Sequence, residues 1–416
     1  MFVIFLFHST FAFQACKTCK SPISNRVQPL EQVKDESTDI LEEIDQDALA
    51  SDTTSQDQGK DINIVAIDTF HTSLGYLISG QERSYFDTII EIEDNFWKDF
   101  SENINKDYEE INNKRLQKMA TWSSTSFIDT DIDTTLVFYP FSGPDFLHAN
   151  FLYPNANEYI LLALEKVGEV PNLRLLDQEQ TEEYLENINM FLRDIYLRSY
   201  FITKHMKIDI EKQNKVPGVL SSLYWFLSRT NHQIVRLERV TIDKDANVVI
   251  KEKSTGLDGV RFHFIKEGET KVKKLTYFAC DISDDGFEED NPELLSYLLK
   301  MRSCNTFVKS ASYLMHYRSF STIRDIILSH SLTIFQDDTG IPYKYFSDSD
   351  WNIRCFGTYV KPIPDFEKNY DILYQKDLAR RYNQGSERLP FSLGYHWRDA
   401  SEQNQMLIIQ RPNINE

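Results

Sequence analysis

Aromatic side chains are distributed very unevenly along this chain of 416 residues. Five phenylalanines lie within residues 1–16, residues 17–61 contain no Phe, Tyr or Trp, and the other 49 aromatic residues follow. Residues 17–61 carry 11 acidic and five basic side chains. Such a polar, charged stretch cannot bury enough apolar surface to fold alone. The sequence therefore predicts a leader (1–16), a disordered acidic tether (17–61) and one large globular domain (62–416), with two subdomains splitting near 215–232 as the alternative.

The leader has the pattern of an export signal. Phe2–Phe7 are continuously apolar and Phe11–Phe13 prolong the run, as in the apolar core of a secretory signal. The basic residues that usually precede such a core are missing. Ala15 precedes Cys16, and a small residue before cysteine at this place is typical of a bacterial lipoprotein signal. We therefore expect an exported protein of the bacterial cell envelope, periplasmic or at the surface, anchored to a membrane by acyl chains on Cys16. The alternative is a buried N-terminal strand.

The overall charge and the cysteines exclude several classes of protein. The formal net charge is −19, whereas a general nucleic-acid binder needs clustered Lys and Arg, so no nucleic-acid partner is expected. Beyond the leader no run of about 18 apolar residues occurs, so no membrane-spanning helix is expected. Five cysteines in a chain of this length do not make a disulfide scaffold. The pairing of Cys280, Cys304 and Cys355 stays open.

The patterns in the domain predict an α+β fold, with a mixed or mainly antiparallel sheet, flanking helices and a long N-terminal helix. That helix is expected within Glu82 to Trp122, where aromatic residues recur three and four apart without Pro or Gly. Strands are expected at 134–139, 158–164, 233–242, 247–251, 260–264, 271–280, 332–336, 353–360, 389–395 and 405–410. Further helices are expected at 177–206, 219–228, 293–302, 306–317, 321–329 and 367–383.

The segment FYPFSGPDFLHA (138–149) is the first candidate for a site. A strand ends at Pro140, and the following turn places Asp145 and His148 beyond the strand's end. A carboxylate with a histidine three residues later can act as an orienting group and a base, or as two metal ligands. The alternative is that Asp145 caps a short helix that carries His148.

The segment TFVKSASYLMH (306–316) is the second candidate. Interpreted as a helix, it places Ser312 and His316 four residues apart on one face, with Lys309 one turn earlier. Such a row can activate a nucleophile if it faces a pocket. The alternative is an amphipathic helix whose polar row lies in water.

The segment FQDDTGIP (335–342) is the third candidate. Asp337 and Asp338 follow a predicted strand. Paired carboxylates can hold a divalent cation or divide into acid and base roles. A plain type I turn explains the same residues.

A fragment of a calcium loop gives a weak metal candidate. Asp281, Ser283 and Asp285 match the first three ligand positions, but Pro292 stands where the loop needs a closing acid. The only cofactor expectation is thus a divalent cation, at this fragment, at the aspartate pair or at Asp145 and His148.

The three strings YPFSGPDFL (139–147), KSASYLMH (309–316) and QDDTGIP (336–342) together resemble a family of uncharacterised bacterial envelope proteins described as lipoproteins. The likeness covers roughly residues 70 to 411 and includes YILLALEKVGEVP (159–171) and LPFSLGY (389–395). The resemblance implies an envelope location. It implies no activity and transfers no catalytic residue.

Three functional hypotheses follow. The first is an exported, lipid-anchored envelope protein whose biochemical role the sequence does not name. The second is an envelope hydrolase with a site built from 141–148, 309–316 and 336–342. The third is a module that binds a glycan or peptide partner through exposed Trp351, Tyr343 and Tyr345. The second requires the three segments to meet in space.

Overall fold

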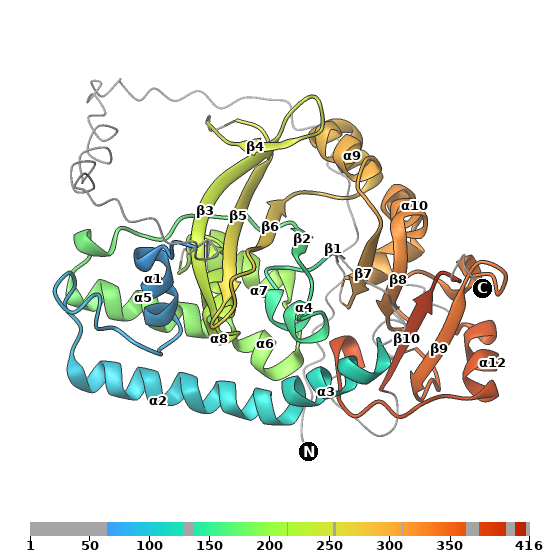
Figure 1. Cartoon of the computed structure of the whole chain (residues 1–416), viewed down its shortest axis with the longest axis horizontal. Helices are drawn as coiled ribbons and strands as arrows, with labels where there is room; N and C mark the ends of the chain where they lie inside the picture. The colour runs from blue at the N-terminus through green and yellow to red at the C-terminus, as the bar shows by residue number, and fades with distance from the viewer. Residues whose placement is uncertain are drawn as a thin grey trace, which may run out of the picture. The chain divides into compact units, whose positions relative to one another are not determined.

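Figure 1 shows a computed structural model of the chain, which describes residues 65–127, 136–213, 215–252, 255–309, 311–362, 374–396 and 404–412. The predicted leader with Cys16, the predicted tether, and the first part of the helix predicted at 367–383 lie outside the described residues. Asn63–Glu416 group as one compact unit. Within the described ranges no helix is both long enough and apolar enough to cross a membrane.

Ten strands of the described residues form one mixed sheet. They are β1 (Leu136–Pro140), β2 (Glu158–Ala163), β3 (His232–Ile242), β4 (Val248–Ile250), β5 (Asp258–Lys266), β6 (Lys273–Ala279), β7 (Cys304–Val308), β8 (Ser331–Gln336), β9 (Asn352–Gly357) and β10 (Gln405–Gln410). Their order is β4-β3-β5-β6-β2-β1-β7-β8-β10-β9. The central strands β6, β2, β1, β7 and β8 run parallel, and those outside them pair antiparallel. The predicted α+β class with a mixed sheet is confirmed.

The central strands are buried on both faces of the sheet. Along β1, Val137 and Tyr139 join one hydrophobic core, while Leu136 and Phe138 join the other. This follows from the strand period of two, which sends neighbouring side chains to opposite faces. A continuous apolar run is therefore what a parallel strand with helices on both sides needs.

The first face is covered by helices that precede β3. They are α1 (Thr69–Ile78), α2 (Asp94–Ile111), α3 (Gln117–Ser126), α4 (Phe146–Leu152), α5 (Gln178–Phe191), α6 (Arg193–Arg198), α7 (Thr203–Lys207) and α8 (Leu220–Arg229). A π-helical turn, η1 (Asn112–Leu116), joins α2 to α3 without a break. At the end of this helix Trp122 packs against the rings of Phe335, Phe356 and Phe391.

The second face is covered by α9 (Pro292–Leu299), α10 (Ser321–His330) and α12 (Lys376–Gln384), drawn in orange and red in Figure 1. These helices pack on the second core through Leu294 of α9, Ile327 of α10 and Leu378 of α12. The remaining short turns are η2 (Leu173–Leu175), η3 (Ile208–Lys212), η4 (Gly286–Asp290), η5 (Ser312–His316), η6 (Arg318–Phe320), η7 (Tyr343–Tyr345) and η8 (Gly394–His396). The sheet thus forms the middle of three layers.

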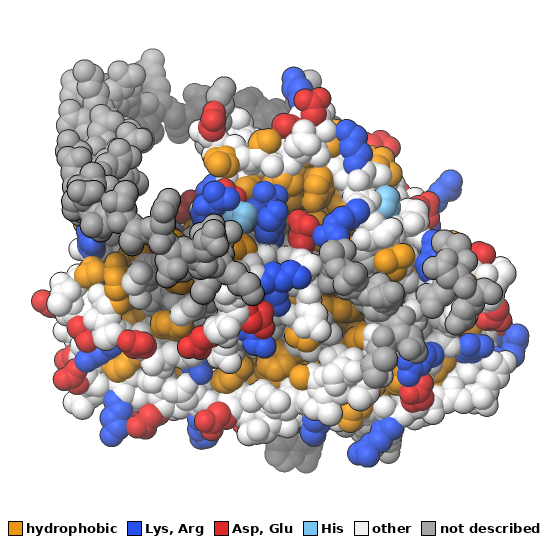
Figure 2. All heavy atoms as spheres, in the orientation of Figure 1, with side chains coloured by type: hydrophobic (Ala, Val, Ile, Leu, Met, Phe, Trp, Pro, Cys, Tyr) orange, Lys and Arg blue, Asp and Glu red, His pale blue; other side chains and the backbone are white. Residues whose placement is uncertain are grey.

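The face drawn in Figure 2 carries acidic and basic side chains close together over β3, β5 and β6. Nε2 of His263 lies 2.9 Å from Glu238, and Arg236 lies 3.1 Å from the same carboxylate. Charges of both signs therefore compensate one another on the antiparallel part of the sheet.

Two predicted elements are wrong. The helix predicted at 306–317 is strand β7 followed by the short turn η5. The spacing of its few apolar residues fits a helix or a strand, and pairing with β1 and β8 decides for the strand. The strand predicted at 389–395 is irregular and ends in η8. Its alternating apolar side chains Leu389, Phe391 and Leu393 enter the first core, although the segment has no strand partner.

The order of the parallel strands changes direction at β1. The chain leaves β1 for β2 on one side and later returns to β7 on the other side. In open α/β sheets ligands bind outside the carboxyl ends of the strands at such a switch point. The carboxyl ends of β1 and β7 are therefore the first place to look for a site.

Candidate functional site

The candidate residues lie at this edge of the sheet. Lys309 directly follows β7, and Asp337 directly follows β8. Asp145 lies five residues beyond the end of β1 and is the N-cap of α4. Because β1, β7 and β8 are parallel, their carboxyl ends share one edge, and residues 164 positions apart in the chain meet there.

Asp145, His148 and Lys309 form a buried group that we call the Asp–His–Lys cluster. Nδ1 of His148 lies 2.8 Å from Oδ1 of Asp145, and the ammonium of Lys309 donates to Oδ2 of that carboxylate. The Lys309 nitrogen lies 3.3 Å from Nδ1 of His148. None of the three residues is more than 1% exposed. Charges so deeply buried persist only when opposite charge and hydrogen bonds compensate them.

The local sequence explains how Asp145 reaches this position. Phe141 and Gly143 have φ of 59° and 56°, which turns the chain sharply after β1. Asp145 then caps α4 by accepting a hydrogen bond of 3.2 Å from the backbone N–H of His148. Both hypotheses for Asp145 therefore apply, since the same carboxylate caps a short helix and contacts the His148 ring.

Three further residues surround the cluster. The hydroxyl of Tyr139 donates to Oδ2 of Asp145 at 3.2 Å. The carbonyl of Ser199 accepts a hydrogen bond from the Lys309 ammonium. Arg115 lies in the π-helical turn η1. Burial lowers the pKa of Arg115 to about 10, and the charge of Asp145 acts in the opposite direction.

The cluster shifts the pKa values of its members strongly. Burial by itself would raise the pKa of Asp145, but the charges and hydrogen bonds of His148 and Lys309 outweigh it and hold that pKa at about 2. Burial lowers the pKa of His148 to about 4 and that of Lys309 to about 8, in both cases against the attraction of Asp145. At neutral pH the imidazole is therefore neutral, and Lys309 supplies the positive charge that keeps Asp145 ionised.

His148 is oriented like a general base. An ionised carboxylate only accepts hydrogen bonds, so we assign the proton of the neutral ring to Nδ1, which donates to Asp145. Nε2 then carries the lone pair. It is buried and has no hydrogen-bond partner among the residues that the structure describes. Other buried atoms of the described residues, such as Nε1 of Trp225 and Nε2 of His232, share this state, so the lone pair matters here because of the ionised Asp145 and Lys309 beside the ring.

Asp337 belongs to a second group of hydrogen-bonded side chains at the same edge of the sheet, which we call the Asp337 group. Its Oδ1 accepts from the Thr339 hydroxyl at 2.5 Å and from the Thr339 backbone N–H at 2.9 Å. The Thr339 hydroxyl in turn lies 3.0 Å from that of Ser312. The expected turn is present, and it ties the segment after β7 to the segment after β8.

Asp338 lies in the same loop as Asp337, and its charge acts on His316. Gln405 donates to Oδ1 of Asp338 at 2.5 Å, and Gln375 donates to the Asp338 carbonyl at 2.8 Å. Burial lowers the pKa of His316 to about 4, while the charge of Asp338 raises it. His316 is thus a neutral ring beside an acidic loop.

Gly394 separates the two groups. A Cβ atom on Gly394 would lie 2.9 Å from the carbonyl oxygen of Lys309, 3.1 Å from its Cγ and 3.4 Å from Oδ2 of Asp337. The φ of Gly394 is also +61°. The Asp–His–Lys cluster and the Asp337 group are therefore neighbours, and only a glycine fits between them.

Residues 199–201 and 394–395 lie over the cluster, and we call them the cover. The backbone N–H of Gly394 donates to Oγ of Ser199 at 2.9 Å. The backbone N–H of Ala311 donates to the hydroxyl of Tyr395 at 2.7 Å, and the rings of Tyr200 and Tyr395 lie 4.9 Å apart. The cover explains why side chains at a strand edge are so fully buried.

The three predicted segments thus come together, but one predicted arrangement is wrong. Lys309, Ser312 and His316 do not form a row on one helix face, because the helix is absent. Lys309 points to Asp145, whereas Ser312 points to Thr339.

The metal candidates gain no support from the geometry. Oδ1 of Asp281 accepts from the backbone N–H of Ser283 at 2.8 Å, and Asp285 precedes the π-helical turn η4. These residues form a local turn. The described part of the chain contains no group of three or more His, Cys, Asp or Glu side chains placed to hold a metal ion.

Several residues at this edge were not among the sequence candidates. Tyr139 and Ser199 form hydrogen bonds with members of the cluster, and the charge of Asp145 acts on the buried Arg115. Glu165, just beyond β2, is buried, and burial raises its pKa to about 7. Tyr395 lies within the LPFSLGY string, and its place in that string is the only feature of the sequence that points to a position near the site.

The aromatic residues of the binding hypothesis are divided. Trp351 is buried at 4% exposure, Tyr343 is half-buried and Tyr345 is exposed. Cys280, Cys304 and Cys355 are buried free thiols.

Comparison with known proteins found no matching family model, no matching curated protein and no matching solved structure.

We expect Asp145→Asn to lower the free energy of unfolding by about 3–5 kcal/mol, because it leaves the Lys309 charge buried without its partner. Lys309→Met should be similarly destabilising, and the double variant should lose clearly less than the sum of the two. Urea unfolding measures all three. Glu269→Gln, which removes the exposed pair with Lys266, should lose less than about 1 kcal/mol. Additive losses would contradict a coupled buried pair.

Gly394→Ala should destabilise the protein more than Gly268→Ala does. Both glycines have a positive φ, +61° and +81°, but nothing lies within 4 Å of a Cβ on Gly268. Gly268→Ala therefore measures the backbone penalty of about 1–2 kcal/mol alone. Gly394→Ala adds overpacking against Lys309 and Asp337, typically about 1–3 kcal/mol. Equal urea midpoints for the two variants would show that the packing at Gly394 is loose.

Proposed function

We propose that the protein is a hydrolase that cleaves an ester or amide bond at the Asp–His–Lys cluster. The observation that carries the proposal is the convergence of a carboxylate, a neutral imidazole with an unpartnered Nε2 and a lysine at the switch point of the sheet. Perturbed titratable groups gathered at such a point favour a catalytic role over a purely structural one.

Each member of the cluster has a defined role in this proposal. Nε2 of His148 takes a proton from the attacking water and returns it to the leaving group. Asp145 holds the ring in the required tautomer and stabilises the imidazolium that forms, as a positioning residue. The ammonium of Lys309 stabilises the negative charge that develops on the carbonyl oxygen.

Substrate reaches the cluster only when the cover moves. Ser199 binds Lys309 through its carbonyl and Gly394 through its hydroxyl, so opening the cover breaks both contacts. Closure excludes water and strengthens the electrostatic contacts inside.

The activity test uses p-nitrophenyl acetate with the full chain. Hydrolysis should rise with pH through about 4, where His148 loses its proton, and fall above about 8, where Lys309 loses its own. His148→Gln should reduce kcat/KM at least a hundredfold, the usual size of a general-base contribution. Lys309→Met should remove the decline above pH 8.

His205→Gln is the matched control. Nδ1 of His205 lies 2.7 Å from Asp194 in a similar contact, but the residue is half-exposed on α7. Its loss should leave hydrolysis unchanged. Equal rates for the His148 and His205 variants would reject the proposed centre.

We also propose that the protein is exported and anchored to the envelope through Cys16. Support comes from the apolar leader, the aromatic-free acidic stretch after it and the resemblance of the three strings to envelope proteins. Acyl chains on the cysteine would hold the domain at a membrane.

Cys16→Ser should move the protein from the membrane fraction to the soluble fraction of cells that express the full chain. Cys19→Ser removes the neighbouring thiol and should leave membrane association unchanged. Immunoblotting of the two fractions measures both variants. Membrane association that survives Cys16→Ser would exclude acylation of this residue.

A further inference from the structure

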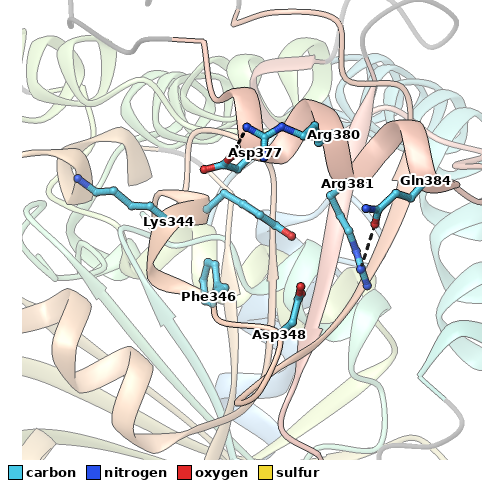
Figure 3. A pocket seen from close by; sticks show the side chains of 8 residues that line it. Lys344, Phe346, Asp348, Asp377, Arg380, Arg381 and Gln384 are labelled. Carbon is cyan, nitrogen blue, oxygen red and sulfur yellow. Dashed lines mark hydrogen bonds and ion pairs between the residues drawn. The ribbon is translucent and has the colours of Figure 1, made fainter.

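A cavity of about 360 Å³ lies between helix α12 and η7 with the loop that follows it (Figure 3). Its volume is at the lower end of the range for small-molecule pockets, about 300–1,000 Å³. Tyr343 and Phe346 contribute aromatic surface, and the remaining lining is mostly charged or polar. The cavity therefore suits a compact polar ligand.

The cavity adjoins the loop that carries Asp337 and Asp338. Tyr343 follows that loop after Pro342, and its backbone N–H donates to Oε1 of Gln375 at 2.8 Å. Nε2 of Gln375 donates to the Asp338 carbonyl at 2.8 Å. One amide side chain thus fixes the cavity wall to the acidic loop.

Only some of the charged side chains that line the cavity are paired with one another. Arg380 pairs with Asp377 at 3.0 Å on α12, so these two compensate each other. Lys344 reaches away from the middle of the cavity in Figure 3. Arg381 and Asp348 remain, on facing sides in that view, and the structure records no ion pair between these two described residues.

Arg381 is held in a fixed orientation. It donates to the Ile353 carbonyl at 2.7 Å and to Oε1 of Gln384 at 3.4 Å. A guanidinium has five N–H donors in a rigid plane, so donors are left for a ligand carboxylate. Asp348 is exposed and receives no hydrogen bond from any described residue. A lone phosphate or sulfate would be attracted by Arg381 but repelled by Asp348.

We propose that this cavity binds a free α-amino acid, with its carboxylate on Arg381 and its ammonium on Asp348. Such a ligand carries one negative and one positive group and no net charge. These two groups match the positive Arg381 and the negative Asp348 of the cavity wall. The aromatic surface of Tyr343 and Phe346 receives the amino acid's side chain. This inference does not depend on the proposed hydrolase, because binding is measured without turnover.

Isothermal titration calorimetry of the full chain with L-phenylalanine and L-glutamine tests the proposal. We expect binding of at least one of them, and a loss of at least tenfold in affinity for its N-acetyl and amide derivatives, which lack one charge each. Glucose and inorganic phosphate are the comparison ligands. Binding of glucose or phosphate in preference to both amino acids would overturn the proposal, and so would no heat with either amino acid at millimolar concentration.

Asp348→Asn should weaken amino-acid binding at least tenfold, because the ammonium loses its charged partner. The matched control is Asp350→Asn, two residues away, whose carboxylate accepts from Ser347 at 2.8 Å and does not line the cavity. Arg381→Lys keeps the charge but loses the planar fork, and should also weaken binding. Thermal melting of each variant checks that it is folded. Unchanged affinity in a folded Asp348→Asn protein would place the ligand elsewhere.

Discussion

The ion pair between Asp145 and Lys309 governs the arrangement of the loops at the carboxyl ends of β1 and β7. Two charges at most 1% exposed are tolerated only if each has a partner. The chain provides these partners from distant segments, through His148 on α4 and the carbonyl of Ser199 after α6. Removing Asp145 or Lys309 leaves the other charge inside the protein without its ionic partner, so the loops that carry these two residues hold one another in place.

Backbone strain gathers at the same edge. Phe141, Ser199 and Ala311 have φ of 59°, 68° and 52°, and they account for three of the five non-glycine residues with positive φ in the described part of the chain. Left-handed conformations of such residues persist only where the surroundings enforce them, which is common at functional sites. Each of the three lies in a loop that contacts the cluster or its cover. The strained residues therefore gather at the edge of the sheet where the Asp–His–Lys cluster lies.

The proposed catalytic centre and the amino-acid cavity are physically connected. Gln375 joins the wall of the cavity to the Asp338 carbonyl, and Gln405 holds the Asp338 carboxylate. A ligand that shifts Tyr343 would therefore act on the loop that packs against Gly394 and the cover.

Local patterns determined a good part of this protein. The burial of β1 and β2, the cap at Asp145, the turn at Asp337 and the mixed α/β composition all follow from short stretches of sequence, because spacing, capping and turn chemistry act over a few residues. The Lys309 segment was misassigned because the five-residue strand before it, Cys304–Val308, is too short for the spacing of its apolar residues to exclude a helix. Only the tertiary structure decided it, since pairing with β1 and β8 comes from residues far along the chain. The same long-range pairing brings Lys309 to Asp145 across 164 residues. A pattern that extends over a few residues cannot predict a contact over that sequence separation.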